Sequence, residues 1–293
     1  MSRPPTFVPP ACARSRTLRT SRGDFAVLDA RPAPGTERGT ALLLPGFTGS
    51  KEDFIALLEP LAAAGYRVVS VDGRGQYETE GPDDPAAYAQ EELARDVLAQ
   101  AEAVAGEGPL HLLGHSLGGQ IARAAVLLDR TPFRTFTVMS SGPARISPSQ
   151  REKVRMLGDA LGVMGMAEVW EAIQALEPSE ETPTDGADLR RRWMLTHPLQ
   201  LITTGRQLST EPDRVAELAA LASLPKHVIS GEEDDTWPVP LMDEMAVRLK
   251  ARRTVVPGAG HSPNTDRPAE TSAAVVAFWD LYPHDTARTS PAS

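Results

Sequence analysis

The order of apolar and polar positions along the chain alternates between strand-length runs and helical repeats. Six apolar runs have the length of buried strands, at 40–44, 67–72, 110–114, 134–140, 227–231 and 252–257. Between them, apolar residues recur three and four positions apart, which is the spacing of a helix with one buried face. This alternation predicts right-handed crossovers and an α/β fold with a mostly parallel central sheet flanked by helices. Two earlier runs, 15–20 and 25–30, are parted by a short polar turn and predict an opening hairpin.

The pattern changes between 142 and 223, where no strand-like run occurs. Four segments there have a helical spacing: 151–164, 167–176, 187–195 and 212–221. A helical insertion in an alternating chain predicts a cap, residues 142–223, that covers the edge of the sheet and gates the access of a substrate. The sheet domain is then predicted to comprise 15–141 and 224–283, with a disordered Pro-rich segment at 1–14 and a loose tail at 284–293.

The chain is acidic, with a net charge of −9 and a pI near 5.3, and without a basic stripe this argues against nucleic-acid binding. The short basic run Arg190-Arg191-Arg192 is expected to be a solvated helix face. The single cysteine, Cys12, excludes an intramolecular disulfide and fits a reducing compartment. No apolar run approaches about 18 residues and no apolar signal segment is evident, so we expect a soluble cytoplasmic protein without a membrane partner.

The stretch Gly114-His115-Ser116-Leu117-Gly118 joins a buried strand to a helix. A serine at so sharp a turn takes strained backbone angles, and glycines two positions before and after it relieve the crowding. Its hydroxyl then stands at a helix N-terminus, whose free N–H groups favour negative charge. Because the glycine–serine spacing also arises by chance, partners for the serine must decide whether Ser116 is a nucleophile.

Acyl transfer by serine needs a base and a carboxylate that orients the base, and in parallel sheets such groups gather at the carboxyl ends of strands. Five of the six histidines are placed elsewhere, within strands, beside the serine, in the predicted cap or in the tail: His111, His227, His115, His197 and His284. His261 follows the strand 252–257 in a loop of small residues. We therefore predict that His261 is the base.

The acid should follow another strand end. The loop after the strand 134–140 holds no carboxylate, whereas the loop after 227–231 begins Glu232-Glu233-Asp234-Asp235. One of these acids is predicted to orient His261. The order along the chain is then serine, acid, histidine.

A tetrahedral intermediate needs two backbone donors for its oxyanion. The N–H of Leu117, at the start of the helix after the serine, is one candidate. The N–H of Phe47, in the glycine-containing loop after the strand 40–44, is the other. Ser50 and Asp53 follow in an S-x-x-D pattern, which predicts a capping box for the next helix.

These residues resemble the α/β-hydrolase superfamily, specifically its capped serine hydrolases, over about 40–141 and 224–281. The segment from Gly231 to Pro238 is similar to the family's G-x-x-D-x-x-x-P pattern, and Gly258-Ala259-Gly260-His261-Ser262 matches its G-x-G-H-S loop. The resemblance implies a triad of Ser116, Asp234 and His261 that works without a cofactor or a metal ion.

Two positions depart from the family pattern. Pro45-Gly46 stands where family members often have His-Gly, and Tyr77 replaces a glycine in the D-x-R-G-x-G-x-S loop that begins at Asp72. Both loops are therefore predicted to differ in shape from the family's at the rim of the site.

A serine nucleophile argues against the haloalkane dehalogenases and epoxide hydrolases of the superfamily, which use aspartate at this turn. What the resemblance implies is acyl chemistry on a small apolar substrate, by default the hydrolysis of an ester through an acyl-enzyme, with lactones, thioesters and amides also open. The alternatives are a biosynthetic thioesterase or cyclase, a C–C hydrolase, or a non-catalytic ligand-binding member, which typically lacks one residue of the triad. Four side chains are predicted to line an apolar pocket, with ordinary core packing as the alternative for the last three: Trp237, Met164, Trp170 and Trp193. The sequence does not indicate an oligomeric state.

Overall fold

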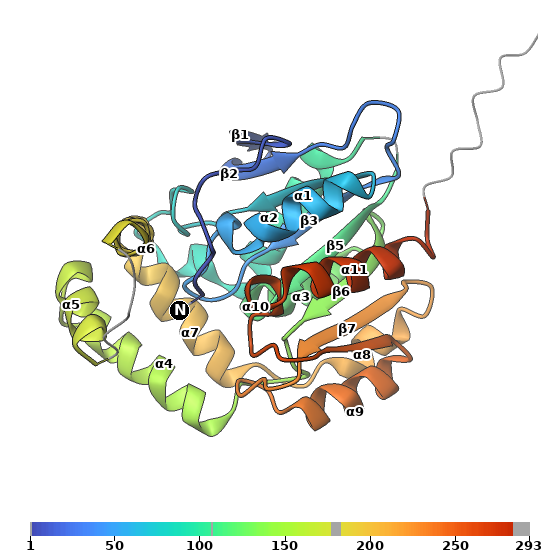
Figure 1. Ribbon diagram of the computed structural model, residues 1–293. Helices are drawn as coiled ribbons and strands as arrows, with labels where there is room; N and C mark the ends of the chain where they lie inside the picture. Colours follow the sequence, from blue (N-terminus) through green and yellow to red (C-terminus); the bar gives the residue numbers. More distant parts are fainter. Residues whose placement is uncertain (1, 107, 177–182, 284–293) are drawn as a thin grey trace, which may run out of the picture.

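A computed structural model describes residues 2–106, 108–176 and 183–283 (Figure 1). Within them one sheet has eight strands in the order β1-β2-β4-β3-β5-β6-β7-β8. The strands are β1 Ala13–Thr20, β2 Gly23–Ala30, β3 Gly39–Leu44, β4 Tyr66–Val71, β5 Leu110–His115, β6 Phe133–Met139, β7 Lys226–Gly231 and β8 Arg252–Val256. The predicted tail, 284–293, lies outside the described residues.

The direction of neighbouring strands depends on the length of the connection between them: a short turn joins antiparallel strands, and a crossover that contains a helix joins parallel strands. β1 and β2 form the predicted hairpin and pair antiparallel, and β2 also runs antiparallel to β4. From β4 through β3, β5, β6 and β7 to β8 every pairing is parallel, and a helix lies in each crossover. The mostly parallel sheet of an α/β-hydrolase fold is therefore confirmed.

Helices cover both faces of the sheet, because alternate residues of each central strand point to opposite faces. Ala41 and Leu43 pack with α1 (Ile55–Ala63) and α11 (Pro268–Trp279). Leu42 and Leu44 belong to the core that includes α2 (Gln90–Val104), α3 (Leu117–Leu128) and α9 (Val239–Leu249). The short elements η1 (Lys51–Phe54), η2 (Pro85–Tyr88) and α10 (Pro263–Asp266) complete the body. No described helix is long and apolar enough to cross a membrane.

Between β6 and β7 the described residues form helices and no strand. The helices are α4 Pro148–Leu161, α5 Met166–Leu176, α6 Pro183–Leu195, α7 Pro198–Thr210 and α8 Val215–Ala220. In Figure 1 α4, α5 and α6 project to one side of the sheet, and α7 lies between them and the body. The apolar pattern had not indicated α7, which begins at a proline. Leu161, Val169, Trp170, Leu189, Trp193 and Leu201 give these helices a core of their own.

The N-terminal segment corrects another expectation, since residues 2–14 are not disordered in the structure. β1 already begins at Ala13. Upstream, the carbonyl oxygen of Ser2 accepts a hydrogen bond of 2.6 Å from Nη2 of Arg192, and the ring of Phe7 lies edge-to-face with that of Tyr77 at 6.3 Å. These partners are far away in the sequence, so the Pro-rich composition of the segment could not reveal them.

Candidate active site

The candidate residues meet at the carboxyl edge of the parallel strands. Ser116 follows β5, Asp234 lies in the loop after β7, and His261 lies in the loop after β8. Phe47 is in the loop after β3, which neighbours β5 in the sheet. Residues that are distant in sequence thus converge because parallel strands end at one edge.

Ser116 occupies a strained turn between β5 and α3. Its φ of 53° and ψ of −118° lie in a region that a side chain disfavours. A Cβ on Gly114 would lie 2.3 Å from the carbonyl oxygen of Gly118, and a Cβ on Gly118 would lie 2.4 Å from that of Leu44. Both glycines are therefore required by close backbone approach, as the sequence pattern had predicted.

A hydrogen-bonded chain joins three side chains at this edge. Nε2 of His261 lies 3.0 Å from Oγ of Ser116, and Nδ1 lies 3.0 and 3.1 Å from the two carboxylate oxygens of Asp234. Asp234 Oδ1 also accepts the backbone N–H groups of Thr236 at 3.0 Å and of Trp237 at 3.3 Å. With Nδ1–H donating to the carboxylate, Nε2 is left to accept the proton of the serine hydroxyl.

The environment keeps Asp234 ionised. Its side chain is buried, and burial by itself would raise the pKa. The hydrogen bond and charge of His261 and the N–H groups of Thr236 and Trp237 outweigh burial and hold the pKa below the usual range. The neighbouring Asp235 instead points to α4, where it accepts a hydrogen bond of 3.0 Å from Gln150.

His115 packs behind the site, in the body of the fold, where the sequence had suggested it would lie. Its Nε2 lies 2.9 Å from the carbonyl oxygen of His261, and the two rings are 5.2 Å apart. Burial, with the nearby His261 ring, lowers the pKa of His115 to about 4. A neutral His115 therefore supports the loop that carries His261.

The loop after β3 brings backbone donors to Ser116. Neither Phe47 N–H nor Leu117 N–H donates a hydrogen bond to any residue in the described part of the chain. Gly46 lies so close that a Cβ there would be 3.1 Å from Cβ of Ser116. Gln76 fixes this loop by donating its side-chain N–H to the carbonyl oxygen of Gly46 at 3.0 Å. Gln76 stands at a variable position of the family loop, so sequence reasoning missed it.

The predicted capping box at Ser50 and Asp53 is wrong. The side chain of Ser50 makes no cap to η1 and donates instead to the carboxylate of Glu52 at 2.6 Å. The carboxylate of Asp53 accepts from Arg192 at 3.0 Å, with both side chains fully buried. The side chain of Asp53, which the local pattern predicts to cap the start of the helix, therefore forms a long-range ion pair with Arg192 instead.

Arg192 also corrects the prediction of a solvated basic face. Arg190 and Arg191 are exposed, but Arg192 is buried, since it bridges Asp53 and the carbonyl oxygen of Ser2. Its guanidinium lies 5.8 Å from the ring centre of Phe7. Arg192 therefore ties α6 to both η1 and the N-terminal segment.

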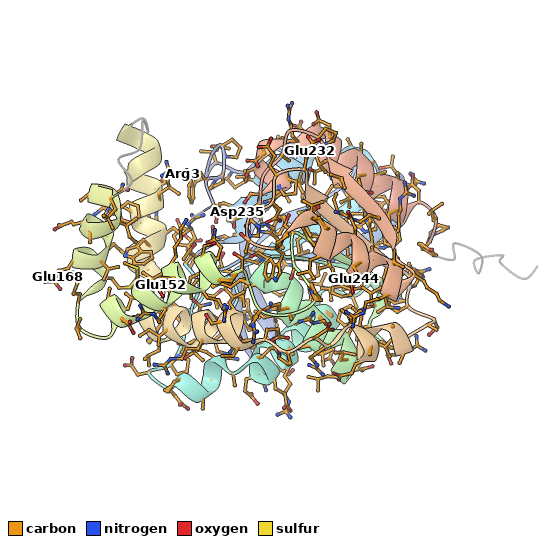
Figure 2. The ribbon with its side chains drawn as sticks, turned by 90° about the horizontal axis from the view of Figure 1, so that it is seen from below. Arg3, Glu152, Glu168, Glu232, Asp235 and Glu244 are labelled. Atoms are coloured by element: carbon orange, nitrogen blue, oxygen red, sulfur yellow. The ribbon has the colours of Figure 1, made fainter. Side chains whose placement is uncertain are left out.

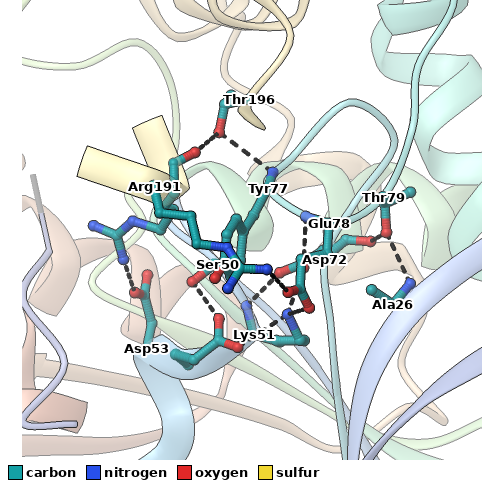
Figure 3. A network of polar contacts seen from close by, with 12 residues as sticks. Ala26, Ser50, Lys51, Asp53, Asp72, Tyr77, Glu78, Thr79, Arg191 and Thr196 are labelled. Atoms are coloured by element: carbon teal, nitrogen blue, oxygen red, sulfur yellow. Dashed lines mark hydrogen bonds and ion pairs between the residues drawn. The ribbon is translucent and has the colours of Figure 1, made fainter. Parts of the chain in front are cut away.

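A second ion cluster lies behind the same loop (Figure 3). Lys51 is buried, and three carboxylates lie 2.8–2.9 Å from its Nζ: Glu52, Asp72 and Glu78. Burial opposes the charge of Lys51, but the carboxylates outweigh it and raise the pKa of Lys51 above its usual range. The cluster holds the loop after β3 against the loop after β4.

Tyr77, which replaces the family glycine, belongs to this cluster. It keeps the left-handed backbone that a glycine would favour, with φ 39°. The Lys51 ammonium lies 4.5 Å from its ring centre, and Oγ1 of Thr196 accepts its N–H at 3.3 Å. Figure 3 shows Thr196 above Tyr77, joining the helical insertion to the loop after β4.

Two adjoining cavities open at the site. The first, called here the reaction cavity, has a volume of about 350 Å³ and is lined by Ser116, His261, Phe47 and residues of α4 and α7. The second, called here the distal chamber, has a volume of about 240 Å³. Both are bordered by the same five residues: Phe47, Thr48, Gln150, Lys153 and Val154.

The four predicted pocket residues divide between lining and packing. Trp170 and Trp193 line the distal chamber. Trp237 is fully buried in the core, donates its indole N–H to the carbonyl oxygen of Ala144 at 2.8 Å and lines neither cavity. Met164 is also outside both linings, in the exposed turn between α4 and α5. Across the described ranges, no group of three or more potential ligand side chains is placed to hold a metal ion.

Residues 41–274 match the model of a family described as the alpha/beta hydrolase family. The chain belongs to this family. It is 26% identical over 242 residues to a 2-hydroxy-6-oxononadienedioate/2-hydroxy-6-oxononatrienedioate hydrolase of Dechloromonas aromatica, with 78% of this chain and 81% of that protein covered. A hydrolase of the same name from Cupriavidus pinatubonensis is 28% identical, with 67% and 69% covered.

Among solved structures, a thermophilic esterase from Thermogutta terrifontis resembles the chain with a TM-score of 0.73 at 22% identity, covering 92% of this chain and 99% of that one. An enol-lactonase from Burkholderia xenovorans gives a TM-score of 0.73 at 19% identity, with 90% and 100% covered. At these identities the likeness concerns the fold.

Proposed function

We propose that the protein is a serine hydrolase that cleaves a carboxylic ester through an acyl-enzyme, with Ser116 as nucleophile, His261 as base and Asp234 as the orienting acid. The continuous chain of hydrogen bonds from Asp234 through His261 to Ser116 carries this proposal. The strained turn adds support, because it presents the hydroxyl at the start of α3.

In the first half-reaction Oγ of Ser116 attacks the carbonyl carbon while Nε2 of His261 takes the hydroxyl proton. The tetrahedral oxyanion accepts the N–H groups of Phe47 and Leu117. Asp234 stabilises the imidazolium, which then gives its proton to the departing alcohol oxygen. The C–O bond breaks and leaves an acyl-serine.

In the second half-reaction a water molecule takes the place of the alcohol. His261 removes its proton, the hydroxyl adds to the acyl carbon, and the collapse of the intermediate returns the proton to Oγ of Ser116. The carboxylic acid is released. We propose that α4–α8 act as a cap over this site, since α4 and α7 contribute to the reaction cavity.

A fluorophosphonate probe tests the nucleophile. The probe should label the wild-type protein at one residue, and Ser116→Ala should lose both the label and at least about three orders of magnitude of kcat on 4-nitrophenyl butyrate. Ser262→Ala is the control, because Ser262 borders the same cavity without a side-chain cap or triad contact, and it should keep the label. If Ser116→Ala retained the wild-type kcat, this result would contradict the proposal.

A C–C hydrolase is the second candidate, because the two curated relatives carry the name of such dioate hydrolases. A vinylogous 1,5-diketone substrate would then be cleaved faster than any activated ester. A panel of esters, lactones, thioesters and one such diketone, compared by kcat/KM, separates this candidate from an esterase and from a thioesterase. A non-catalytic binder is disfavoured because the three triad positions are filled.

A further inference from the structure

We propose that Gln76 is a positioning residue for the oxyanion: its side-chain amide holds the peptide group between Gly46 and Phe47 and so directs the Phe47 N–H into the reaction cavity. The inference deepens the proposed hydrolase function and rests on it for the role of the Phe47 N–H as an oxyanion donor. Gln76 belongs to the loop after β4 and acts through the backbone of the loop after β3.

The peptide group between Gly46 and Phe47 is held by its carbonyl oxygen. That oxygen accepts the side-chain N–H of Gln76 at 3.0 Å and the backbone N–H of Gly49 at 3.2 Å. Because a trans peptide group is planar, its N–H points in the direction opposite to its C=O. Two hydrogen bonds that fix the direction of the Gly46 carbonyl therefore also fix the direction of the Phe47 N–H.

The two sides of this peptide group face different parts of the protein. Gly46 and Phe47 line the reaction cavity, whereas Gln76 is buried and does not line it. Figure 2 shows Asp235, another residue of this lining, between the body and the helix α4 that carries Glu152. The carbonyl oxygen that points to Gln76 thus points away from the reaction cavity, and the N–H points toward it.

The N–H of Phe47 is available to an oxyanion beside Ser116. No described residue accepts a hydrogen bond from it. The peptide group lies close to the nucleophile, since a Cβ on Gly46 would be 3.1 Å from Cβ of Ser116. A hydrogen bond weakens steeply when its donor is misaligned, so a rotation of this peptide group would reduce the stabilisation of the tetrahedral intermediate.

A second partner determines the orientation of the Gln76 side chain. Its Oε1 accepts the backbone N–H of Gly73 at 2.9 Å, so the NH2 group is the one that faces the carbonyl oxygen of Gly46. Exchanging the two amide atoms would place oxygen against oxygen and an NH2 group against an N–H. A Cβ on Gly73 would be 2.7 Å from Oε1 of Gln76, so glycine at this position makes room for the amide.

The backbone of Gln76 is also held on both sides. Its N–H donates to the carbonyl oxygen of Gly73 at 2.9 Å, and its own carbonyl oxygen accepts the N–H of Thr79 at 2.9 Å. The next residue, Tyr77, donates its N–H to Oγ1 of Thr196 in the helical insertion. Gln76 is therefore a donor of fixed position, and its burial keeps solvent from competing for its amide.

Two substrates that differ in one atom test the proposal. O-4-nitrophenyl thionobutyrate carries sulfur in place of the carbonyl oxygen of 4-nitrophenyl butyrate, and sulfur is the weaker acceptor of hydrogen bonds. Wild-type kcat/KM should therefore favour the oxygen ester. Gln76→Met, which keeps a similar side-chain length without an N–H, should lower kcat/KM for the oxygen ester about tenfold to a hundredfold and the ratio of the two esters about tenfold. KM should stay near its wild-type value, because the oxyanion donors act on charge that develops in the transition state.

A transition-state analogue gives a readout that does not depend on the natural substrate. Butyl trifluoromethyl ketone forms a tetrahedral adduct with a serine nucleophile, and the oxygen of this adduct takes the place of the oxyanion. The Ki of the ketone should rise about tenfold or more in Gln76→Met. Titration with the fluorophosphonate probe counts the active sites of each preparation, so a partly unfolded variant does not imitate the effect.

Two further variants separate the lost donor from altered packing. Gln76→Leu removes the same N–H with a side chain of different shape and should behave like Gln76→Met. Gln100→Met is the control, because Gln100 on α2 is also a buried amide and borders the same small cavity as Gln76. It forms no hydrogen bond with residues 45–50, all of which the structure describes, and should keep the wild-type ester ratio and Ki.

The outcomes distinguish this inference from the proposed function. If the probe does not label Ser116 in the wild type, the assigned nucleophile is wrong. If Ser116 is labelled while Gln76→Met and Gln76→Leu keep the wild-type ester ratio and the wild-type Ki of the ketone, only the role of Gln76 is wrong. An equal loss for both esters with an unchanged Ki would also contradict this role, because it would mean that Gln76 supports the fold without directing the donor.

Discussion

Asp234 and Asp235 are consecutive carboxylates in opposite environments. The side chain of Asp234 is buried and faces His261, whereas Asp235 is exposed and contacts Gln150 on α4. Only the first is held by backbone N–H groups that fix its direction toward the imidazole. The difference arises because adjacent residues in a turn point their side chains in different directions.

Asp234→Asn should therefore lower kcat by several orders of magnitude without unfolding the protein, because an amide favours the wrong imidazole tautomer and does not stabilise the imidazolium. Asp235→Asn is the matched control and should keep most of the activity. Kinetics on an activated ester, with circular dichroism of both variants, measures this. The reverse pattern would mean that the other carboxylate orients His261.

How much of the site the sequence could predict depends on what each side chain does. Ser116 and His261 could be placed because each follows a strand, and parallel strands end together. The same rule left four neighbouring acids open, and only the resemblance to the family pattern singled out Asp234. Trp237 could not be placed, since burial turns its ring into the core while its backbone N–H serves Asp234. Nothing in the sequence indicated the role of Gln76, because its side chain donates a hydrogen bond to a backbone carbonyl oxygen of a loop that is distant in sequence.

At the level of elements, the sharp turn between β5 and α3 is possible only because Gly114 and Gly118 have no side chains. Neither Gly114 nor Gly118 has a positive φ, so their requirement is space rather than backbone freedom. Carbonyl groups of the chain occupy the positions where their Cβ atoms would be. Backbone cannot move aside as a flexible side chain can.

Gly114→Ala should therefore destabilise the protein by several kcal/mol, about the range of severe core substitutions, and reduce activity. Gly158→Ala is the control in helix α4, where a Cβ would meet nothing within 4 Å. There alanine should stabilise the protein by about 0.5–1 kcal/mol. Urea denaturation of the two variants checks the contrast, and equal effects would contradict the steric explanation.

The predicted helices differ from the observed ones where contacts between residues distant in sequence determine how a helix begins. α7 begins at Pro198 and its N-cap, His197, accepts the N–H of Leu199, which the apolar pattern did not register. The predicted capping box of η1 does not form, because Asp53 pairs with Arg192. The inner parallel strands β3 to β7 were predictable because nearly all of their residues are buried, which leaves strand-length apolar runs in the sequence.

At the scale of the whole molecule, buried neutral histidines make stability depend on pH. His227 on β7 is buried with its ring 4.8 Å from that of Phe278. Burial, with Arg252 and Arg253 nearby, lowers its pKa to about 3. The folded protein therefore leaves His227 neutral at a pH where the unfolded chain binds a proton.

The sign follows from the depressed pKa of the folded state. Stability from His227 is fully present above the unfolded pKa of about 6.5 and is lost as the pH falls toward the folded value. Between pH 6.5 and 5 the loss should be about 2 kcal/mol, at about 1.4 kcal/mol per pH unit. Urea unfolding of the wild type and of His227→Gln at pH 7.5 and 5 should show a smaller drop in the variant. Equal drops would contradict this origin.

The anchored N-terminal segment has a practical consequence for how the protein is handled. Any sequence fused ahead of Ser2 would emerge beside the opening that leads to Ser116, since Ser2 borders that cavity. The described chain ends at Pro283, beyond α11, on the other side of the molecule from the N-terminal segment (Figure 1). An affinity tag at the amino terminus is therefore itself a variable in any kinetic comparison of this protein.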